Sequence, residues 1–97
     1  MNDLYFDWDE NKNLANVKKH NITFELAKSV FYDDMGILIH DPDHSIDEDR
    51  FILLGMSEDA NILVVCHCFR EHNVIRIISA RKATKNEDKQ YKNQEGW

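Results

Sequence analysis

The chain has 97 residues, of which 42% are hydrophobic and 31% charged, and it contains three glycines and one proline. This composition is typical of a single globular domain over residues 1–97, argues against disorder, and excludes collagen-like and low-complexity chains. The longest uncharged apolar run, residues 61–69, is too short for a membrane-spanning helix, which needs about 20 residues. Residues 1–3 lack the basic start of a secretory signal. We therefore expect a cytoplasmic protein without membrane association.

The formal net charge of −6 by itself argues against a nucleic-acid partner, but the charge is unevenly distributed along the chain. Residues 1–60 hold 5 basic and 14 acidic side chains, a net charge of −9, whereas residues 61–97 hold 7 basic and 4 acidic ones, a net charge of +3. A basic second half is compatible with a local phosphate-binding surface and also with ordinary solvated faces.

The two cysteines, Cys66 and Cys68, flank His67. Two residues apart on a strand, the cysteines are badly placed for an unstrained disulfide, and small apolar residues of a buried strand are the favoured interpretation. A zinc site formed by these three residues is disfavoured, because the strand pleat directs His67 to the opposite face.

The first part of the chain predicts helices. Residues 4–8 form either an edge strand or an aromatic anchor on the core. Asp7 or Asp9 can cap a helix that runs to about Lys19, with acidic residues at its start and basic residues at its end, as the helix dipole favours. A second helix is expected from Thr23 to near residue 31, because apolar residues recur there at helical spacing.

From residue 35 the apolar pattern changes to that of strands. Four strands are expected, at residues 35–40, 50–56, 62–70 and 74–80, joined by short turns that favour antiparallel pairing. Thr84 and Glu87 then predict a capping box at the start of a last helix. Tyr91 is the one large apolar residue of that helix, which is therefore barely amphipathic.

The expected fold is α+β, with two N-terminal helices, a four-stranded antiparallel sheet and a C-terminal helix. Both faces of the third strand are apolar, with Leu63, Val65 and Phe69 on one face and Ile62, Val64, Cys66 and Cys68 on the other. One face must bury the N-terminal helices. The other needs a cover from the C-terminal helix or from another chain.

A succession of short motifs along residues 5–91 resembles the BrnT family of toxins. Each motif is weak alone, but their order is specific. The residues that carry the resemblance are Phe6–Lys12, Asn16, Lys18–His20, Phe24–Ala27, Val30–Phe31, Asp33–Asp34, Glu48–Phe51, Gly55–Ser57, Ile75–Thr84, Glu87 and Tyr91.

The resemblance implies a RelE-like fold and a ribonuclease toxin of a type II toxin–antitoxin system that cleaves RNA without metal or other cofactor and arrests translation and growth. It also implies neutralisation by a BrnA-like ribbon-helix-helix antitoxin, in a heterotetramer that binds operator DNA only through the antitoxin.

Metal-free RNA cleavage needs a base for the 2′-hydroxyl, a cation for the charge that develops on phosphorus, and an acid for the leaving oxygen. The candidates for these catalytic roles are His67, Arg70, Arg81 and Lys82, and the candidates for RNA binding are Arg76, Lys12, Lys19, His20 and Lys85. Strand parity places Arg76 and Lys82 on one face and Arg81 on the other, unless the strand ends or bulges before Arg81. We expect a phosphate beside Arg81 and Lys82, at the start of the Thr84 helix.

Purely structural interpretations stay open for several of these residues. Arg50, which follows Glu48, is expected to be a salt-bridged strand start. Arg76 could be buried against an N-terminal carboxylate such as Asp9 or Glu10. His67 could equally be a core histidine.

Two other functions compete with the ribonuclease. The pair Cys68-Phe69 stands where related toxins often place a polar or acidic side chain, which favours a weak nuclease or a non-catalytic subunit that acts in the antitoxin complex and in operator co-repression. A metal site is the third alternative, but a solvated acidic loop is the favoured interpretation of its candidate ligands. Those candidates are His40, Asp41, Asp43, His44, Asp47, Glu48 and Asp49.

Overall fold

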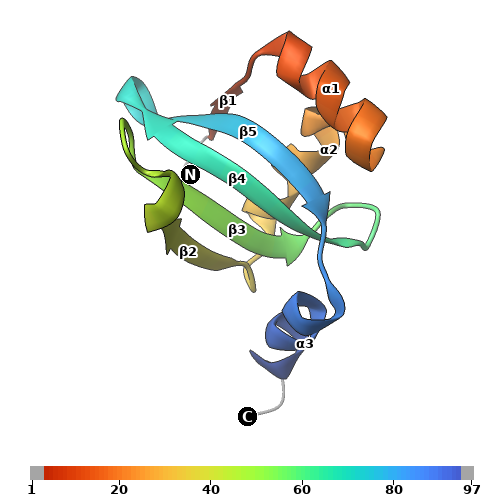
Figure 1. The fold of residues 1–97 in the computed structure, drawn as a ribbon. Helices are drawn as coiled ribbons and strands as arrows, with labels where there is room; N and C mark the ends of the chain where they lie inside the picture. The colour runs from red at the N-terminus through yellow and green to blue at the C-terminus, as the bar shows by residue number, and fades with distance from the viewer. Residues whose placement is uncertain (1–3, 95–97) are drawn as a thin grey trace.

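The computed structural model describes residues 4–94, which form a mixed sheet with helices against it (Figure 1). The strands are β1 (Tyr5–Asp7), β2 (Ile37–Asp41), β3 (Arg50–Met56), β4 (Ile62–Arg70) and β5 (Val74–Lys82). The α-helices are α1 (Glu10–His20), α2 (Phe24–Ala27) and α3 (Lys85–Asn93), and the 3-10 helices are η1 (Lys28–Tyr32), η2 (Pro42–His44) and η3 (Glu71–Asn73). Residues 1–3, on which the expectation about a secretory signal rests, lie outside the described part. None of the helices described is both long enough and apolar enough to span a lipid bilayer.

The strands described in residues 4–94 form one sheet of five, in the order β1-β5-β4-β3-β2. Strands β2 to β5 pair antiparallel, as expected, but the prediction of a purely antiparallel four-stranded sheet is wrong, because β1 adds a fifth strand parallel to β5. A three-residue strand is too short to show an alternating pattern. Its parallel neighbour lies far along the chain, so no hairpin turn indicates the pairing.

The N-terminal helices cover one face of the sheet (Figure 1). An oxygen of Asp9 accepts a 2.8 Å hydrogen bond from the Asn11 backbone amide at the start of α1, and Asn21 ends the helix in the left-handed conformation with φ of 58°. The expected second helix is only partly α-helical. It changes after Ala27 to the tighter η1 turn.

The two faces of the sheet are packed unequally. The helix-covered face holds the larger core, formed by Ile22, Phe24, Ala27, Val30, Leu53, Leu63, Val65, Ile77 and Ala80. The opposite face, called the open face below, holds the smaller cluster of Leu54, Ile62, Val64 and Tyr91. Tyr91 is the buried residue of α3, so this polar helix covers only one end of the open face.

Strand β5 contains a bulge at Ile78. Along β4, Cys66 pairs with Ser79 while its neighbour His67 pairs with Ile77, which leaves Ile78 without a Cα partner on β4. Such an extra residue shifts the alternation of all side chains beyond it.

The bulge decides which side chains of β5 share a face. Ile77 and Ala80 both lie in the helix-covered core, although regular alternation would send residues three apart to opposite faces. Arg76 and Arg81 consequently share the open face, whereas Lys82 falls on the same side as Ala80. The regular parity expected from the sequence, with Arg76 and Lys82 on one face and Arg81 on the other, is therefore not the one found. Of the two exceptions left open, a strand end or a bulge, the structure contains the bulge.

The side chain of Asn16 holds the bulged segment from the helix side. Its amide nitrogen donates to the carbonyl oxygens of Ile22 and Ala80, each at 2.9 Å, and its amide oxygen accepts from the Ala80 N–H at 3.0 Å. Because β1 pairs with β5 only as far as Arg76, this buried amide bonds a backbone edge that has no neighbouring strand there.

Candidate functional site

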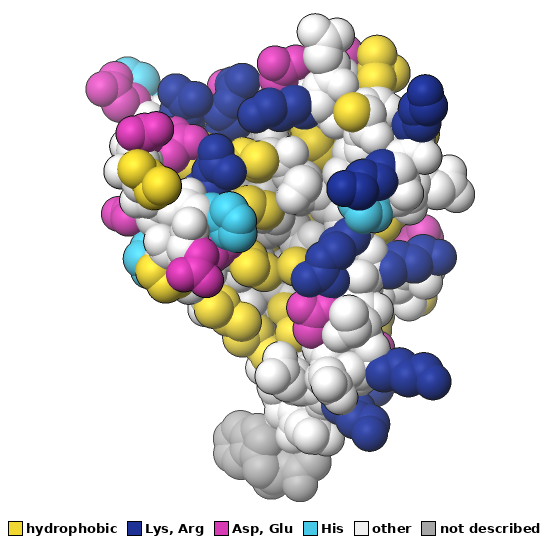
Figure 2. Space-filling view, in the orientation of Figure 1, with side chains coloured by type: hydrophobic (Ala, Val, Ile, Leu, Met, Phe, Trp, Pro, Cys, Tyr) yellow, Lys and Arg dark blue, Asp and Glu magenta, His cyan; other side chains and the backbone are white. Residues whose placement is uncertain are grey.

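The open face carries four arginines. Arg50 of β3 and Arg76 of β5 are both Cα partners of Cys68 on β4, so they lie in one row across the sheet. Arg70 follows Cys68 by two residues on β4 and has the same parity, while Arg81 lies toward the other end of β5. The structure thus places Arg70, Arg76 and Arg81 from the predicted set on one face and adds Arg50. In Figure 2, basic side chains border the apolar centre of this face.

A groove with a volume of about 240 Å³ crosses the open face. Its floor is apolar and its rim is polar. The floor is formed by Ile52, Val64, Cys66 and Ile78, and the rim by Asp41, His44, Arg50, Ser79 and Arg81. An apolar floor between cationic side chains can accommodate a flat base together with a phosphate.

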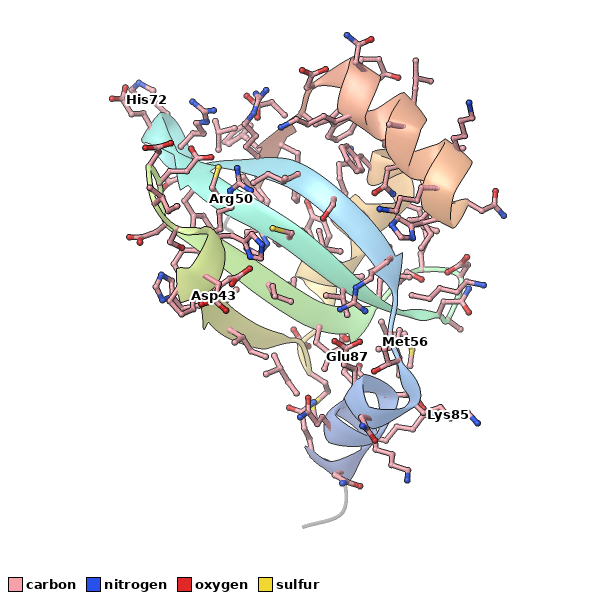
Figure 3. The ribbon with its side chains drawn as sticks, in the orientation of Figure 1. Asp43, Arg50, Met56, His72, Lys85 and Glu87 are labelled. Carbon is pink, nitrogen blue, oxygen red and sulfur yellow. The ribbon has the colours of Figure 1, made fainter. Side chains whose placement is uncertain are left out.

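Arg50 lies at the start of β3 and reaches the groove rim (Figure 3). Its Nε lies 3.8 Å from Glu48, so the prediction of a salt-bridged strand start is confirmed. The same Nε is buried and has no hydrogen-bond partner within residues 4–94. An unpaired buried donor is costly, and an anionic acceptor in the groove would relieve this cost only if the Arg50 side chain turned to expose its Nε–H.

His44 supplies an imidazole ring to the rim of this groove, and sequence reasoning considered it only as a metal ligand. Its Nδ1 lies 2.9 Å from a carboxylate oxygen of Asp41, and the ring is otherwise exposed. If Nδ1 carries the proton and donates to Asp41, the lone pair of Nε2 is available as a base. The spacing of Asp41 and His44 around Pro42 was the available signal, since a single turn brings such a pair together.

The acidic loop forms separate pairs. His40 lies 3.3 Å from Asp49, apart from the pair between His44 and Asp41. Within the described part of the chain, no three His, Cys, Asp or Glu side chains converge as a metal-binding group.

Arg76 pairs with a different carboxylate from those expected. Its Nη1 lies 3.3 Å from Asp7, rather than from Asp9 or Glu10, because the parallel register of β1 places Asp7 directly opposite Arg76. The Arg76 side chain is 30% exposed and that of Asp7 is 49% exposed, so this is a surface pair and not a buried charge.

Arg81 forms a two-pronged ion pair with Glu87 of α3. Its Nη1 and Nη2 donate to the two carboxylate oxygens at 2.8 and 3.0 Å. The predicted capping box of Thr84 and Glu87 is present. At the start of α3, where a phosphate was expected, the carboxylate of Glu87 thus already accepts hydrogen bonds from Arg81 and from the backbone.

His67 lies on the helix-covered face, with none of its surface exposed, and is not brought together with the arginines. Its Nδ1 donates to the Val65 carbonyl oxygen at 3.0 Å, and its ring contacts Phe31, Phe51 and Phe69. Burial lowers the pKa of His67, and only the hydrogen bond to Val65 opposes this effect. The interpretation of His67 as a core histidine therefore fits its position, and a role in direct contact with RNA does not.

The other predicted site residues, the catalytic candidate Lys82 and four RNA-binding candidates, do not line the groove. Lys82 is exposed on the opposite side of β5, as the bulge requires. Lys12, Lys19 and His20 belong to α1, which packs in the helix layer against β5. Lys85 lies on α3 and points away from the sheet in Figure 3.

Comparison with known proteins supports the resemblance and extends it to the fold. The family model described as "Ribonuclease toxin, BrnT, of type II toxin-antitoxin system" matches residues 8–87, from Trp8 before α1 to Glu87 in α3. No curated protein sequence matches significantly.

Among solved structures, the fold is similar to the 1.1 Å crystal structure of the Brucella abortus ribonuclease toxin BrnT. The TM-score is 0.58 at 23% sequence identity, over 86% of this chain and 100% of that chain. Because the family model covers most of the sequence, from the first helix cap to the capping box beside the groove, the chain belongs to the BrnT family of ribonuclease toxins of type II toxin–antitoxin systems.

Proposed function

We propose that this chain is a metal-independent RNA endonuclease that binds its substrate on the open face of the sheet and arrests translation and growth. The observation that carries the proposal is the bulge at Ile78, which places Arg81 on the same face as Arg50, Arg70 and Arg76. Two of these arginines, Arg50 and Arg81, line the rim of one groove. Guanidinium groups suit phosphate oxygens because their N–H groups form a planar fork.

In the proposed reaction, Nε2 of His44 accepts the proton of the ribose 2′-hydroxyl while Asp41 orients the ring. The 2′ oxygen attacks phosphorus, the bond to the 5′ oxygen breaks, and a 2′,3′-cyclic phosphate and a 5′-hydroxyl result. Arg50 and Arg81 stabilise the negative charge that develops on the phosphate oxygens. The departing 5′ oxygen takes a proton from solvent in the open groove.

Binding depends on these local arginines, because the protein as a whole carries a net charge of −6 and does not attract RNA over long distances. RNA affinity should therefore be modest and should fall as salt concentration rises.

A BrnA-like ribbon-helix-helix antitoxin is the proposed partner. The open face retains partly exposed apolar side chains such as Ile39, which is 45% exposed, because α3 covers only one end of that face. We expect the antitoxin to form a tight heterotetramer through its own dimer and to supply the contact with operator DNA.

The second candidate function is that of a non-catalytic subunit of the antitoxin complex. Three arginines of the open face are already paired with carboxylates, Arg50 with Glu48, Arg76 with Asp7 and Arg81 with Glu87. Such pairing reduces the net positive charge that RNA would meet. This candidate predicts antitoxin binding without RNA cleavage.

One assay separates the two candidates. The purified chain is incubated with total RNA in EDTA, with and without its antitoxin, and the 3′ ends of the products are analysed. Cleavage to cyclic phosphates that resists EDTA and stops when antitoxin is added supports the endonuclease. A chain that binds antitoxin at micromolar concentration but leaves RNA intact would support the non-catalytic subunit. Loss of cleavage in EDTA would contradict metal independence.

A further inference from the structure

The carboxylate of Glu87 lies between α3 and the groove and contacts both (Figure 3). One oxygen, Oε1, accepts hydrogen bonds from Arg81 Nη1 and from the Thr84 backbone N–H, each at 2.8 Å. The other oxygen, Oε2, accepts from Arg81 Nη2 at 3.0 Å. Glu87 therefore joins the first turn of α3 to an arginine of the groove rim.

These contacts use one edge of the Arg81 guanidinium and leave another edge free. Nη1 donates both to Glu87 and to the Lys82 carbonyl oxygen, the latter at 3.2 Å, and one N–H of Nη2 donates to Glu87. Of the five N–H groups of an arginine, the Nε–H and the second Nη2–H make no hydrogen bond within residues 4–94. They lie side by side on one edge of the plane, in the spacing that matches two oxygens of a phosphate.

A capping box alone does not require this arrangement. Either Glu or Gln can close such a box, because the helix start needs one acceptor for the Thr84 N–H. The second oxygen of Glu87 and its negative charge are used by Arg81. Arg81 in turn holds the pKa of Glu87 at about 2, so the pair stays ionised at every pH at which RNA cleavage would be measured.

We propose that Glu87 is a positioning residue for RNA cleavage, which holds Arg81 so that the free Nε–Nη2 edge presents a ready fork to the scissile phosphate in the groove. This inference rests on the proposed ribonuclease function. An unrestrained arginine side chain would sample many rotamers and would lose more entropy on binding the phosphate. A displacement of about 1 Å at a reacting centre can reduce a rate by 10²-fold.

The variant that tests the proposal is Glu87→Gln, because glutamine preserves the capping box but removes the charge and the two-pronged pair. The matched control is Asp88→Asn. Asp88 stands in the same turn of α3, pairs with Lys92 at 2.9 Å and makes no contact with Arg81. The two variants change the net charge equally, so a purely electrostatic effect on RNA attraction would appear in both.

We expect Glu87→Gln to reduce the single-turnover cleavage rate roughly 10- to 100-fold, while Asp88→Asn cleaves at the parent rate. Both variants should keep the antitoxin complex. A double-mutant cycle distinguishes this positioning role of Glu87 from a purely structural role in α3. In an Arg81→Ala background, Glu87→Gln should cause no further loss of rate, because Glu87 acts through Arg81.

Parent-like cleavage by a folded Glu87→Gln protein would overturn the inference and leave the ribonuclease function standing. The inference would also be overturned if Glu87→Gln reduced the cleavage rate by the same factor in the Arg81→Ala background as in the parent. If the parent chain cleaves no RNA, the proposed function fails and this inference fails with it.

If Glu87→Gln does not fold, Arg81→Lys replaces it as the test, since lysine keeps the charge beside Glu87 but has no planar fork. Parent-like cleavage by Arg81→Lys would then contradict the proposal.

Discussion

The helix-covered face and the open face of the sheet are built from the same strands, yet they differ in what their polar groups do. On the helix-covered face, polar side chains such as Asn16 and His67 are buried and bond to the backbone. On the open face, arginines pair with carboxylates at the surface, and two of them, Arg50 and Arg81, line the groove. Successive side chains of a strand point to opposite faces of the sheet, so each strand contributes to both faces. Polar groups under the helices are shielded from solvent and stabilise the fold, whereas polar groups on the open face are accessible to a ligand.

The largest expected effect concerns the covered face. Leu63 is fully buried there, so Leu63→Ala should lower the free energy of unfolding by about 2–5 kcal/mol through lost burial and a cavity. Ile39→Ala on the open face is the control and should change it by no more than about 0.5 kcal/mol. Urea denaturation measures both values. Equal losses would show that the open face is packed as tightly as the covered one.

A smaller loss is expected from Asn16→Ala. The change leaves the buried backbone groups of Ala80 and the carbonyl of Ile22 without this partner, which should cost about 1–3 kcal/mol. If Asn16 also holds the bulge, RNA cleavage should fall in the folded variant because Arg81 turns away from the groove. Full stability and full cleavage in Asn16→Ala would show that the bulge does not depend on this amide.

The buried imidazole predicts how stability changes with pH. The pKa of His67 is lowered in the folded protein, so below the ordinary value near 6.5 the unfolded chain binds a proton that the folded chain does not. Stability from this group is complete above that pH and is lost as the pH falls toward the folded pKa, by up to about 1.4 kcal/mol per pH unit. Denaturation midpoints measured across this range should fall less steeply for His67→Phe. An unchanged slope would show that other groups cause the pH dependence.

The smallest effect is expected from Arg76→Ala. A buried ion pair would make this change severely destabilising, but the pair with Asp7 is partly exposed and should contribute no more than about 1 kcal/mol. A thermal melt measures the difference from the parent. A shift as large as that of Leu63→Ala would mean that Arg76 is buried in solution.

Local signals predicted much of this fold. Asp9 at the start of α1 and the capping box before α3 follow from side chains that bond to nearby backbone, and the structure contains both. The alternation in β4 also predicted two apolar faces correctly, because a central strand with residues of both faces buried shows this pattern in its own sequence.

The features that the sequence did not predict depend on partners far along the chain. The parallel pairing of β1 and the contact of Arg76 with Asp7 arise from a register that no local pattern encodes. The bulge at Ile78 could be stated only as a condition, since it depends on β4 and on Asn16 in α1. His44 was considered only as a metal ligand, because nothing local places it at a groove formed by four strands.

The central claim is that the open face, and not the whole basic half of the chain, cleaves RNA. Arg81 and Lys82 are neighbours of like charge on opposite faces of β5, so Arg81→Ala and Lys82→Ala form a matched pair. Single-turnover cleavage of RNA should fall about 10²- to 10³-fold in Arg81→Ala, as when one transition-state donor is removed, and should stay at the parent rate in Lys82→Ala. Equal losses in the two variants, or full activity in Arg81→Ala, would contradict this account.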